Sequence, residues 1–176
     1  MTPLTVEDRA RRIRLVLLDV DGVLTDGTVI IHASGEESKG FDIKDGAAVV
    51  WALDAGLRVG LLSARESRAT AERARQLGIT IVVQGASSKS AAFEEILGDL
   101  DVAYDEVAYM GDDLVDLPVM SRSGLAGAPA DAAAETAAAA HWISGRNGGR
   151  GAVREFLELI LKAQGRWTAI VSDFSG

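Results

Sequence analysis

The amino-acid sequence predicts an α/β fold in which helices cover both faces of a parallel central sheet. Short apolar runs alternate with helix-like segments along the chain, and this alternation is typical of parallel strands joined by right-handed crossovers. The first run, Leu15 to Leu18, is apolar at every position, as expected for a strand buried on both faces. We therefore predict a Rossmann-like three-layer sandwich with a β-hairpin flap and no cap domain.

Length and composition favour one globular domain. The chain has 176 residues, 48% of them hydrophobic, which suits a single core. We expect residues 1–176 to form that domain, with its core at about 13–165 and a C-terminal tail at 166–176. The net charge of −8 argues against a nucleic-acid partner, because nucleic-acid binding needs a basic face.

Cysteine content and hydropathy indicate the cellular compartment of the protein. The chain has no cysteine, which excludes disulfides and cysteine nucleophiles and is typical of a reducing compartment. No apolar run approaches the length of a membrane span, and the N-terminal segment lacks the apolar core of a signal peptide. We expect a cytoplasmic protein without a membrane partner.

The first third of the chain contains the predicted flap. Residues 1–12 are polar and form either a solvated leader or the start of a helix. Strand-like residues at 28–31, a turn-rich piece at 33–37 and a second run that ends at 41–43 predict a β-hairpin. Because the hairpin directly follows the acidic end of the first strand, it is a candidate flap over a site.

The remaining strands and helices follow in alternation. Helical periodicity and capping residues predict helices at 47–55, 66–77, from Ser87 or Ser88 to about 97, 114–122, 131–140 and 151–164. Apolar runs predict strands at 57–62, 79–83, 107–110 and 125–126, with 142–143 as an edge strand. Asp131 is expected to cap the alanine-rich helix that ends near Ala140.

Polar residues follow four predicted strands. They are Asp19 with Asp21, Ser63, Lys89, and Asp112 with Asp113 and Asp116. The carboxyl ends of parallel strands lie on one edge of a sheet, where open α/β folds bind ligands, so we expect these groups to converge. Carboxylates gathered there need a cation, which indicates a metal or phosphate site. Taken singly, each signal has a plainer alternative, such as an Asp-Gly turn, a capping serine or a solvated lysine.

The chemistry that these residues fit is phosphoryl transfer through an aspartyl-phosphate. Asp19 would act as the nucleophile, and Asp21 would protonate the leaving oxygen and then activate water. Because the carboxylate and the phosphate are both anionic, a cation must lie between them, and Mg²⁺ prefers such oxygen ligands. We expect Asp19, Asp21 and Asp112 to bind Mg²⁺.

Other residues complete the predicted site. Ser63 and Lys89 would hold the phosphoryl oxygens, one by hydroxyl donation and the other as a point charge. Gly22 would free backbone N–H groups to donate to the phosphate as well. Asp113 and Asp116 would orient the metal ligands or Lys89.

These motifs resemble those of the haloacid dehalogenase-like phosphatases. DVDGVL, which begins at Asp19, is similar to the first motif of that family, and LLSAR supplies the hydroxyl of the second at Ser63. Lys89 falls where the lysine of the third motif is expected, and GDDLVD matches the fourth, acidic motif. Receiver domains of response regulators carry similar groups, but their acidic pair comes first, whereas here the candidate nucleophile comes first.

The resemblance narrows to a small capless branch that removes phosphate from 3-deoxy-D-manno-octulosonate 8-phosphate. DVDGVLTDG, FDIKDG, QGASSK, GDDLVDLPVM and NGGRGAVREF occur in that order and cover roughly residues 13–165. The resemblance implies Mg²⁺ dependence, a homotetramer and a role in lipopolysaccharide sugar synthesis. Ala64 stands where many relatives have glycine, and residues 167–176 align with nothing.

Two alternatives remain open at this point. One is a phosphatase that acts on a nine-carbon sugar-acid 9-phosphate of the sialic acid type. The other is a phospho-accepting or ligand-binding module without turnover.

The spacing of the motifs also indicates an open site. Between Asp19 and Ser63 there is room only for the hairpin and one helix, whereas a lid domain would need a core of its own. Neighbouring copies could close such a site, which predicts a symmetric oligomer. For the carboxylate of a sugar acid, the candidate ligands are Arg65, Lys44 and Arg150, each with a solvated surface position as its alternative. The segment NGGRG is either a loop near the ligand or a flexible start to the last helix.

Overall fold

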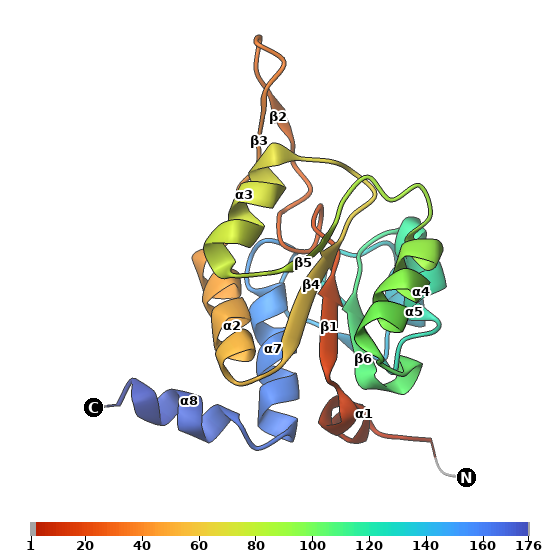
Figure 1. Cartoon of the computed structure of the whole chain (residues 1–176), viewed down its shortest axis with the longest axis vertical. Coiled ribbons are helices and arrows are strands. Elements are labelled where there is room, and N and C mark those ends of the chain that lie inside the picture. The colour runs from red at the N-terminus through yellow and green to blue at the C-terminus, as the bar shows by residue number, and fades with distance from the viewer. Residues whose placement is uncertain (1–2, 176) are drawn as a thin grey trace.

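The structure, a computed structural model, describes residues 3–175 and contains a six-stranded sheet (Figure 1). The strand order is β5-β4-β1-β6-β7-β8, and all neighbouring strands are parallel. The strands are β1 (Leu15–Leu18), β4 (Arg58–Leu62), β5 (Ile81–Val83), β6 (Val107–Met110), β7 (Leu125–Ala128) and β8 (Trp142–Ile143). The predicted α/β sandwich is confirmed, with β8 as the predicted edge strand.

Helices cover both faces of this sheet (Figure 1). Successive residues of β1 point to opposite faces: Val16 and Leu18 pack in the core cluster with α2 and α7, and Leu15 and Leu17 pack in the cluster with α4 and α5. The helices are α1 (Val6–Arg12), α2 (Ile43–Asp54), α3 (Arg68–Leu77), α4 (Lys89–Leu100), α5 (Leu117–Met120), α6 (Ala134–Ala139), α7 (Ala152–Ala163) and α8 (Trp167–Asp173). Within residues 3–175, no helix is long and apolar enough to cross a lipid bilayer.

The register of the central strands brings distant residues to one edge. Leu18, the last residue of β1, pairs with Leu61 of β4 on one side and with Met110 of β6 on the other. The segments that follow these three strands therefore leave the sheet at the same level, as expected for parallel neighbours.

A hairpin of two-residue strands, β2 (Ile30–Ile31) and β3 (Glu37–Ser38), projects beyond this edge (Figure 1). The predicted hairpin is present, but the prediction that its second strand ends at 41–43 was wrong. Asp42 instead begins a helix, because its Oδ1 accepts hydrogen bonds from the N–H groups of Lys44 (2.6 Å) and Asp45 (3.2 Å). As a result, α2 starts four residues earlier than predicted.

Two other helix predictions were corrected by local hydrogen bonds. Asp131 does not cap α6, which starts at Ala134 without a side-chain cap. Its carboxylate accepts the N–H of Gly148 instead, at 2.9 Å. The helix predicted at 114–122 divides into a 3₁₀ turn, Leu114–Asp116, and the short α5.

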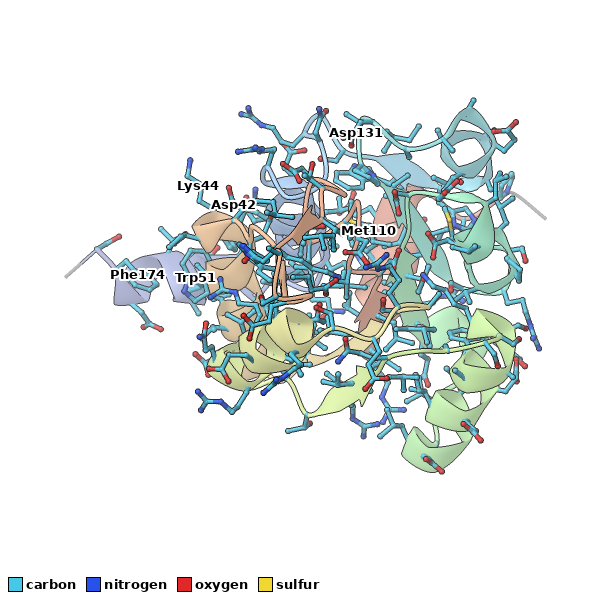
Figure 2. All side chains as sticks on the ribbon, turned by 90° about the horizontal axis from the view of Figure 1, so that it is seen from above. Asp42, Lys44, Trp51, Met110, Asp131 and Phe174 are labelled. Atoms are coloured by element: carbon cyan, nitrogen blue, oxygen red, sulfur yellow. The ribbon has the colours of Figure 1, made fainter. Side chains whose placement is uncertain are left out.

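Both ends of the described chain are helical. Thr5 forms a capping box with Asp8 at the start of α1, so the start of a helix was the correct alternative for the leader, although Met1 and Thr2 lie outside the described residues. Most of the tail forms α8. Trp167 contacts Trp51 of α2 with ring centroids 5.9 Å apart, and Phe174 lies next to Trp51 (Figure 2). Figure 1 places α8 at the end of the molecule opposite the hairpin.

Candidate active site

The residues predicted from separate strand ends lie together at the carboxyl edge of the sheet. Asp19 follows β1, Ser63 follows β4, Asp112 lies two residues after β6, and Lys89 is the first residue of α4. They share a pocket of about 200 Å³, which is lined by Asp19, Asp21, Ser63, Ala64, Arg65, Lys89, Asp112, Asp113 and Val115. The structure thus brings together most of the predicted site.

The ammonium of Lys89 is the buried centre of this group. Its Nζ lies 2.8 Å from Asp19 Oδ1 and 2.7 Å from Asp116 Oδ1, and it donates more weakly to the Tyr109 hydroxyl at 3.3 Å. Burial by itself lowers the pKa of Lys89, but the charges of Asp19 and Asp116 outweigh burial and raise it. Lys89 therefore stays protonated, as its predicted phosphate-binding role requires.

Asp116 supports the site through buried contacts. It is fully buried, and its Oδ1 also accepts the Tyr109 hydroxyl at 2.5 Å. Its Oδ2 accepts the backbone N–H groups of Asp112 (2.9 Å) and Asp113 (3.2 Å), which fixes the acidic loop after β6. Asp113 points its carboxylate at the N–H of Leu114 (2.8 Å). These contacts agree with the orienting role expected of Asp116.

Two carboxyl groups in the pocket have raised pKa values. Burial and the charge of Asp116 raise the pKa of Asp19 to about 6, against the opposing effect of Lys89. Burial and the charges of Asp19 and Asp116 raise the pKa of Asp112 to about 7. Carboxylates crowded in this way favour a cation, which would relieve their mutual repulsion.

The donor set fits a hard divalent cation. Among residues 3–175, the carboxylates that could hold a metal ion together belong to Asp19, Asp112 and Asp116, with ligand atoms within 4.8 Å of one another. Lys89 contacts Asp19 through Oδ1, whereas both oxygens of Asp116 are engaged, Oδ1 by Lys89 and Oδ2 by backbone N–H groups. In contrast, Asp112 Oδ1 is buried without a hydrogen-bond partner. Asp19 and Asp112 are therefore the carboxylates that a metal would use.

Gly22 allows Asp112 to approach the first loop. A Cβ at Gly22 would lie 2.0 Å from Asp112 Oδ2, and the residue has φ +90°, a conformation that glycine adopts without strain. Its N–H donates to Thr25 Oγ1 at 3.4 Å. Ser63 is buried, and its hydroxyl oxygen accepts the N–H of Arg65 at 3.2 Å. The phosphate-binding roles of Gly22 and Ser63 stay predictions.

Asp21 faces cations rather than the other carboxylates. Its Oδ1 lies 2.7 Å from the Nζ of Lys39, and its Oδ2 lies 3.4 Å from the Nε of Arg65. Arg65 also pairs with Glu37 at 3.1 Å. The role of Asp21 as a metal ligand stays a prediction. Our sequence reasoning missed Lys39 and Glu37, because a charged residue in a hairpin is ordinarily solvated and no pattern marks it as buried.

Lys44 and Arg150 do not line the pocket of Asp19. They border a separate cavity of about 340 Å³ together with Asp26, and Arg150 Nη2 lies 3.2 Å from Asp26 Oδ2. Seen from above, Lys44 lies away from Met110, the last residue of β6 (Figure 2). Of the three basic residues proposed to bind a substrate carboxylate, the structure places only Arg65 beside the acidic cluster.

A model of the haloacid dehalogenase-like hydrolases matches residues 62–157. The chain belongs to this family, as its fold and its acidic pocket at the strand ends also indicate. It is 44% identical, over 158 residues, to 3-deoxy-D-manno-octulosonate 8-phosphate phosphatase KdsC of Escherichia coli K12, with 90% of this chain and 84% of that protein covered.

Solved structures show the same likeness. The phosphatase of that name from Yersinia pestis has a TM-score of 0.90 at 42% identity, with 92% of this chain and 87% of that one covered. The Moraxella catarrhalis phosphatase, solved with a magnesium ion, a phosphate ion and a KDO molecule, has a TM-score of 0.94 at 34% identity, with 96% and 97% covered.

Proposed function

We propose that this chain is a phosphomonoesterase that hydrolyses 3-deoxy-D-manno-octulosonate 8-phosphate to the free sugar acid and phosphate. The observation that carries the proposal is the buried contact of Lys89 with Asp19 and Asp116, where Lys89 and Asp19 line one pocket with Asp112. These are the groups that phosphoryl transfer to a carboxylate needs. The substrate follows from relatives 43–44% identical over about 90% of the chain that bear this activity in their names.

The reaction proceeds in two steps. Asp19 attacks phosphorus, so that a carboxylate O–P bond forms while the ester P–O bond breaks, and Asp21 gives its proton to the leaving alcohol oxygen. In the second step Asp21 takes a proton from water, which attacks the aspartyl-phosphate and releases phosphate. Lys89 and Ser63 hold the phosphoryl oxygens, and Asp116 keeps Lys89 in position.

The cofactor in this proposal is Mg²⁺. Asp19 and Asp112 would hold it, with Asp21 as the further predicted ligand. When bound, Mg²⁺ offsets the repulsion between the carboxylates and the phosphoryl group. The buried, unpartnered Asp112 Oδ1 supports this assignment.

Arg65 is the residue best placed to bind the carboxylate of the sugar acid. It borders the pocket, and its side chain is 54% exposed, so the guanidinium is free to turn toward an entering anion. Lys44 and Arg150 would take part only if the sugar extends to the second cavity.

The further proposals are a homotetramer and a cytoplasmic location, the latter because the chain lacks cysteine.

Phosphate release tests the function directly. The protein is assayed on 3-deoxy-D-manno-octulosonate 8-phosphate with Mg²⁺ and with EDTA, beside a nine-carbon sugar-acid 9-phosphate and other phosphosugars. We expect fast, EDTA-sensitive release from the octulosonate. Faster release from the nine-carbon acid would retain the mechanism and overturn the substrate, whereas stable phosphorylation without release would overturn the phosphatase.

A further inference from the structure

A buried lysine directly after the hairpin contacts Asp21. The Lys39 side chain, which follows β3, is 1% exposed, although Ile31 in β2 is 67% exposed. A lysine is seldom buried without a counter-ion, because its charge loses hydration. The counter-ion here is Asp21, whose Oδ1 lies 2.7 Å from the ammonium. Lys39 therefore meets the residue assigned to proton transfer.

Lys39 belongs to a closed ring of four charged side chains. Beyond its contact with Asp21, its Nζ lies 3.9 Å from Glu37 Oε1, Glu37 Oε2 lies 3.1 Å from Arg65 Nη2, and Arg65 Nε lies 3.4 Å from Asp21 Oδ2. Two carboxylates and two cations make the ring neutral. Glu37 lies in β3 and Lys39 directly follows it, whereas Asp21 and Arg65 follow β1 and β4. The ring thus joins the hairpin to the pocket.

The two cations of this ring differ in how readily they can leave Asp21. Arg65 is 54% exposed and its contact with Asp21 is the longer one, while Lys39 is 1% exposed. An exposed guanidinium leaves a carboxylate for a substrate anion at little cost, because water screens both states. A buried ammonium has no such alternative. Lys39 is therefore the permanent partner of Asp21, and Arg65 is the exchangeable one.

We propose that Lys39 is a positioning residue for this reaction. Lys39 donates to Oδ1 of Asp21, and Arg65 leaves Oδ2 when it turns to the anionic part of the substrate. Oδ2 is then the oxygen that carries the proton, and Lys39 holds the carboxyl group where Oδ2 gives that proton to the leaving oxygen. This inference rests on the proposed function, in which Asp21 is the general acid.

Leaving-group dependence tests the proposal. A sugar alkoxide needs a proton to leave, whereas 4-nitrophenolate leaves without one. For Lys39→Met we expect kcat/KM to fall by at least about 10-fold on the best phosphosugar and less than about 3-fold on 4-nitrophenyl phosphate. We compare kcat/KM because it does not include the later hydrolysis of the aspartyl-phosphate. Equal losses on both substrates would overturn the proposal.

The design contains its own controls. Both substrates are assayed with the same preparation of each variant. A loss of folded protein therefore lowers both kcat/KM values by the same factor and leaves their ratio unchanged. Lys162→Met removes an exposed lysine of α7, paired with Glu158, and should change neither value. If the wild-type protein hydrolyses no phosphomonoester at all, the proposed function fails rather than the inference about Lys39.

A second measurement is independent of activity. Urea midpoints are compared for Lys39→Met, Asp21→Asn and the double variant. We expect the midpoint shift of the double variant to be smaller than the sum of the single shifts, because each single change removes the same contact. Additive shifts would show that Lys39 does not hold Asp21 and would overturn the proposal.

Discussion

At the level of single residues, the contacts of Lys89 explain how the carboxylates of Asp19 and Asp116 lie close together. Its buried ammonium lies within 2.8 Å of both Asp19 and Asp116. Removing one partner of a buried ion pair leaves the other charge uncompensated and costs about 3–5 kcal/mol. Asp116 also binds Tyr109 and the backbone of the acidic loop. It therefore supports the fold of the site as well as the orientation of Lys89.

Asp19→Asn should abolish turnover. The amide is a poor nucleophile, so we expect kcat for phosphosugar hydrolysis to fall by at least about 10³-fold, with an unchanged circular dichroism spectrum. Asp99→Asn, at an exposed position of α4, is the matched control and should keep full activity. Phosphate release by Asp19→Asn at the wild-type rate would refute the assignment of the nucleophile.

Asp112 should make the stability of the metal-free protein depend on pH. Its pKa in the folded state is about 7, above the ordinary value of 3.8, so between these values the native state binds more protons than the unfolded state. Stability conferred by the protonated group is therefore present at low pH and is lost as pH rises toward 7.

Urea unfolding in EDTA at pH 5 and pH 8 tests whether the protonated form of Asp112 stabilises the protein at the lower pH. Asp112→Asn stays neutral, so its stability relative to wild type should be more favourable at pH 8 than at pH 5. Added Mg²⁺ should stabilise the wild type at pH 8, because a ligand that binds only the native state favours it. A difference that does not vary with pH would contradict the prediction.

At the scale of elements, α2 and α7 are joined by one buried carboxylate. Asp45 Oδ1 accepts the N–H of Arg154 at 2.7 Å, and its Oδ2 accepts the N–H of Gly151 at 3.1 Å. Asp45 thereby satisfies free N–H groups at the start of α7, which has no side-chain cap of its own. Burial raises the pKa of Asp45 to about 6 against the opposing effect of these bonds.

The glycine-rich segment before α7 supports the loop that follows Asp19. A Cβ at Gly148 would lie 1.8 Å from the carbonyl oxygen of Gly22, and the N–H of Gly149 donates to the Val23 carbonyl at 2.9 Å. Neither glycine lines the pocket of Asp19. The segment thus packs against the backbone behind the pocket, an arrangement that neither interpretation of NGGRG anticipated.

Asp45→Ala should destabilise the protein by about 2–3 kcal/mol, because two N–H groups at the start of α7 lose a charged acceptor. Asp54→Ala, at the exposed end of the same helix, should change stability by less than about 0.5 kcal/mol. Urea unfolding in the presence of Mg²⁺ measures both. Equal effects of the two substitutions would show that the link between α2 and α7 contributes little.

For the whole molecule, the projecting hairpin presents exposed apolar residues. Ile30 and Ile31 of β2 are 56% and 67% exposed, and exposed apolar residues that lie together often mark an interface. Between β1 and α2 the structure contains only loops and this hairpin. A second copy of the chain packed on the hairpin would cover both the apolar residues and the approach to the pocket.

Ile31→Lys should therefore weaken assembly. We expect the wild-type protein to sediment with the mass of four copies, and the variant to shift toward smaller species with at least about 10-fold lower kcat/KM, since a lysine is costly to bury at an interface. Val171→Lys, on α8 far from the hairpin, is the control and should leave the mass unchanged. A wild-type protein with the mass of one chain would contradict the tetramer.

The fold could be predicted because its signals are local. The apolar run of β1, the serine that caps α4 at Ser88 and the amphipathic pattern of α7 each act within a few residues. The wrong predictions concern polar side chains that could form hydrogen bonds with either of two segments. Asp42 capped a helix where a strand was expected, and Asp131 bonded the Gly148 segment rather than its own helix.

The residues that meet at the sheet edge could be predicted from the sequence alone, because Asp19, Ser63, Lys89 and Asp112 each follow a strand of one parallel sheet and strand ends are local features. The contacts of those residues could not be predicted in this way. The contact of Lys39 with Asp21 and the placement of Lys44 and Arg150 in a second cavity depend on how the hairpin and loops fold back. The physical reason is that ion pairs between segments distant in sequence form by packing, which leaves no periodic pattern in the chain.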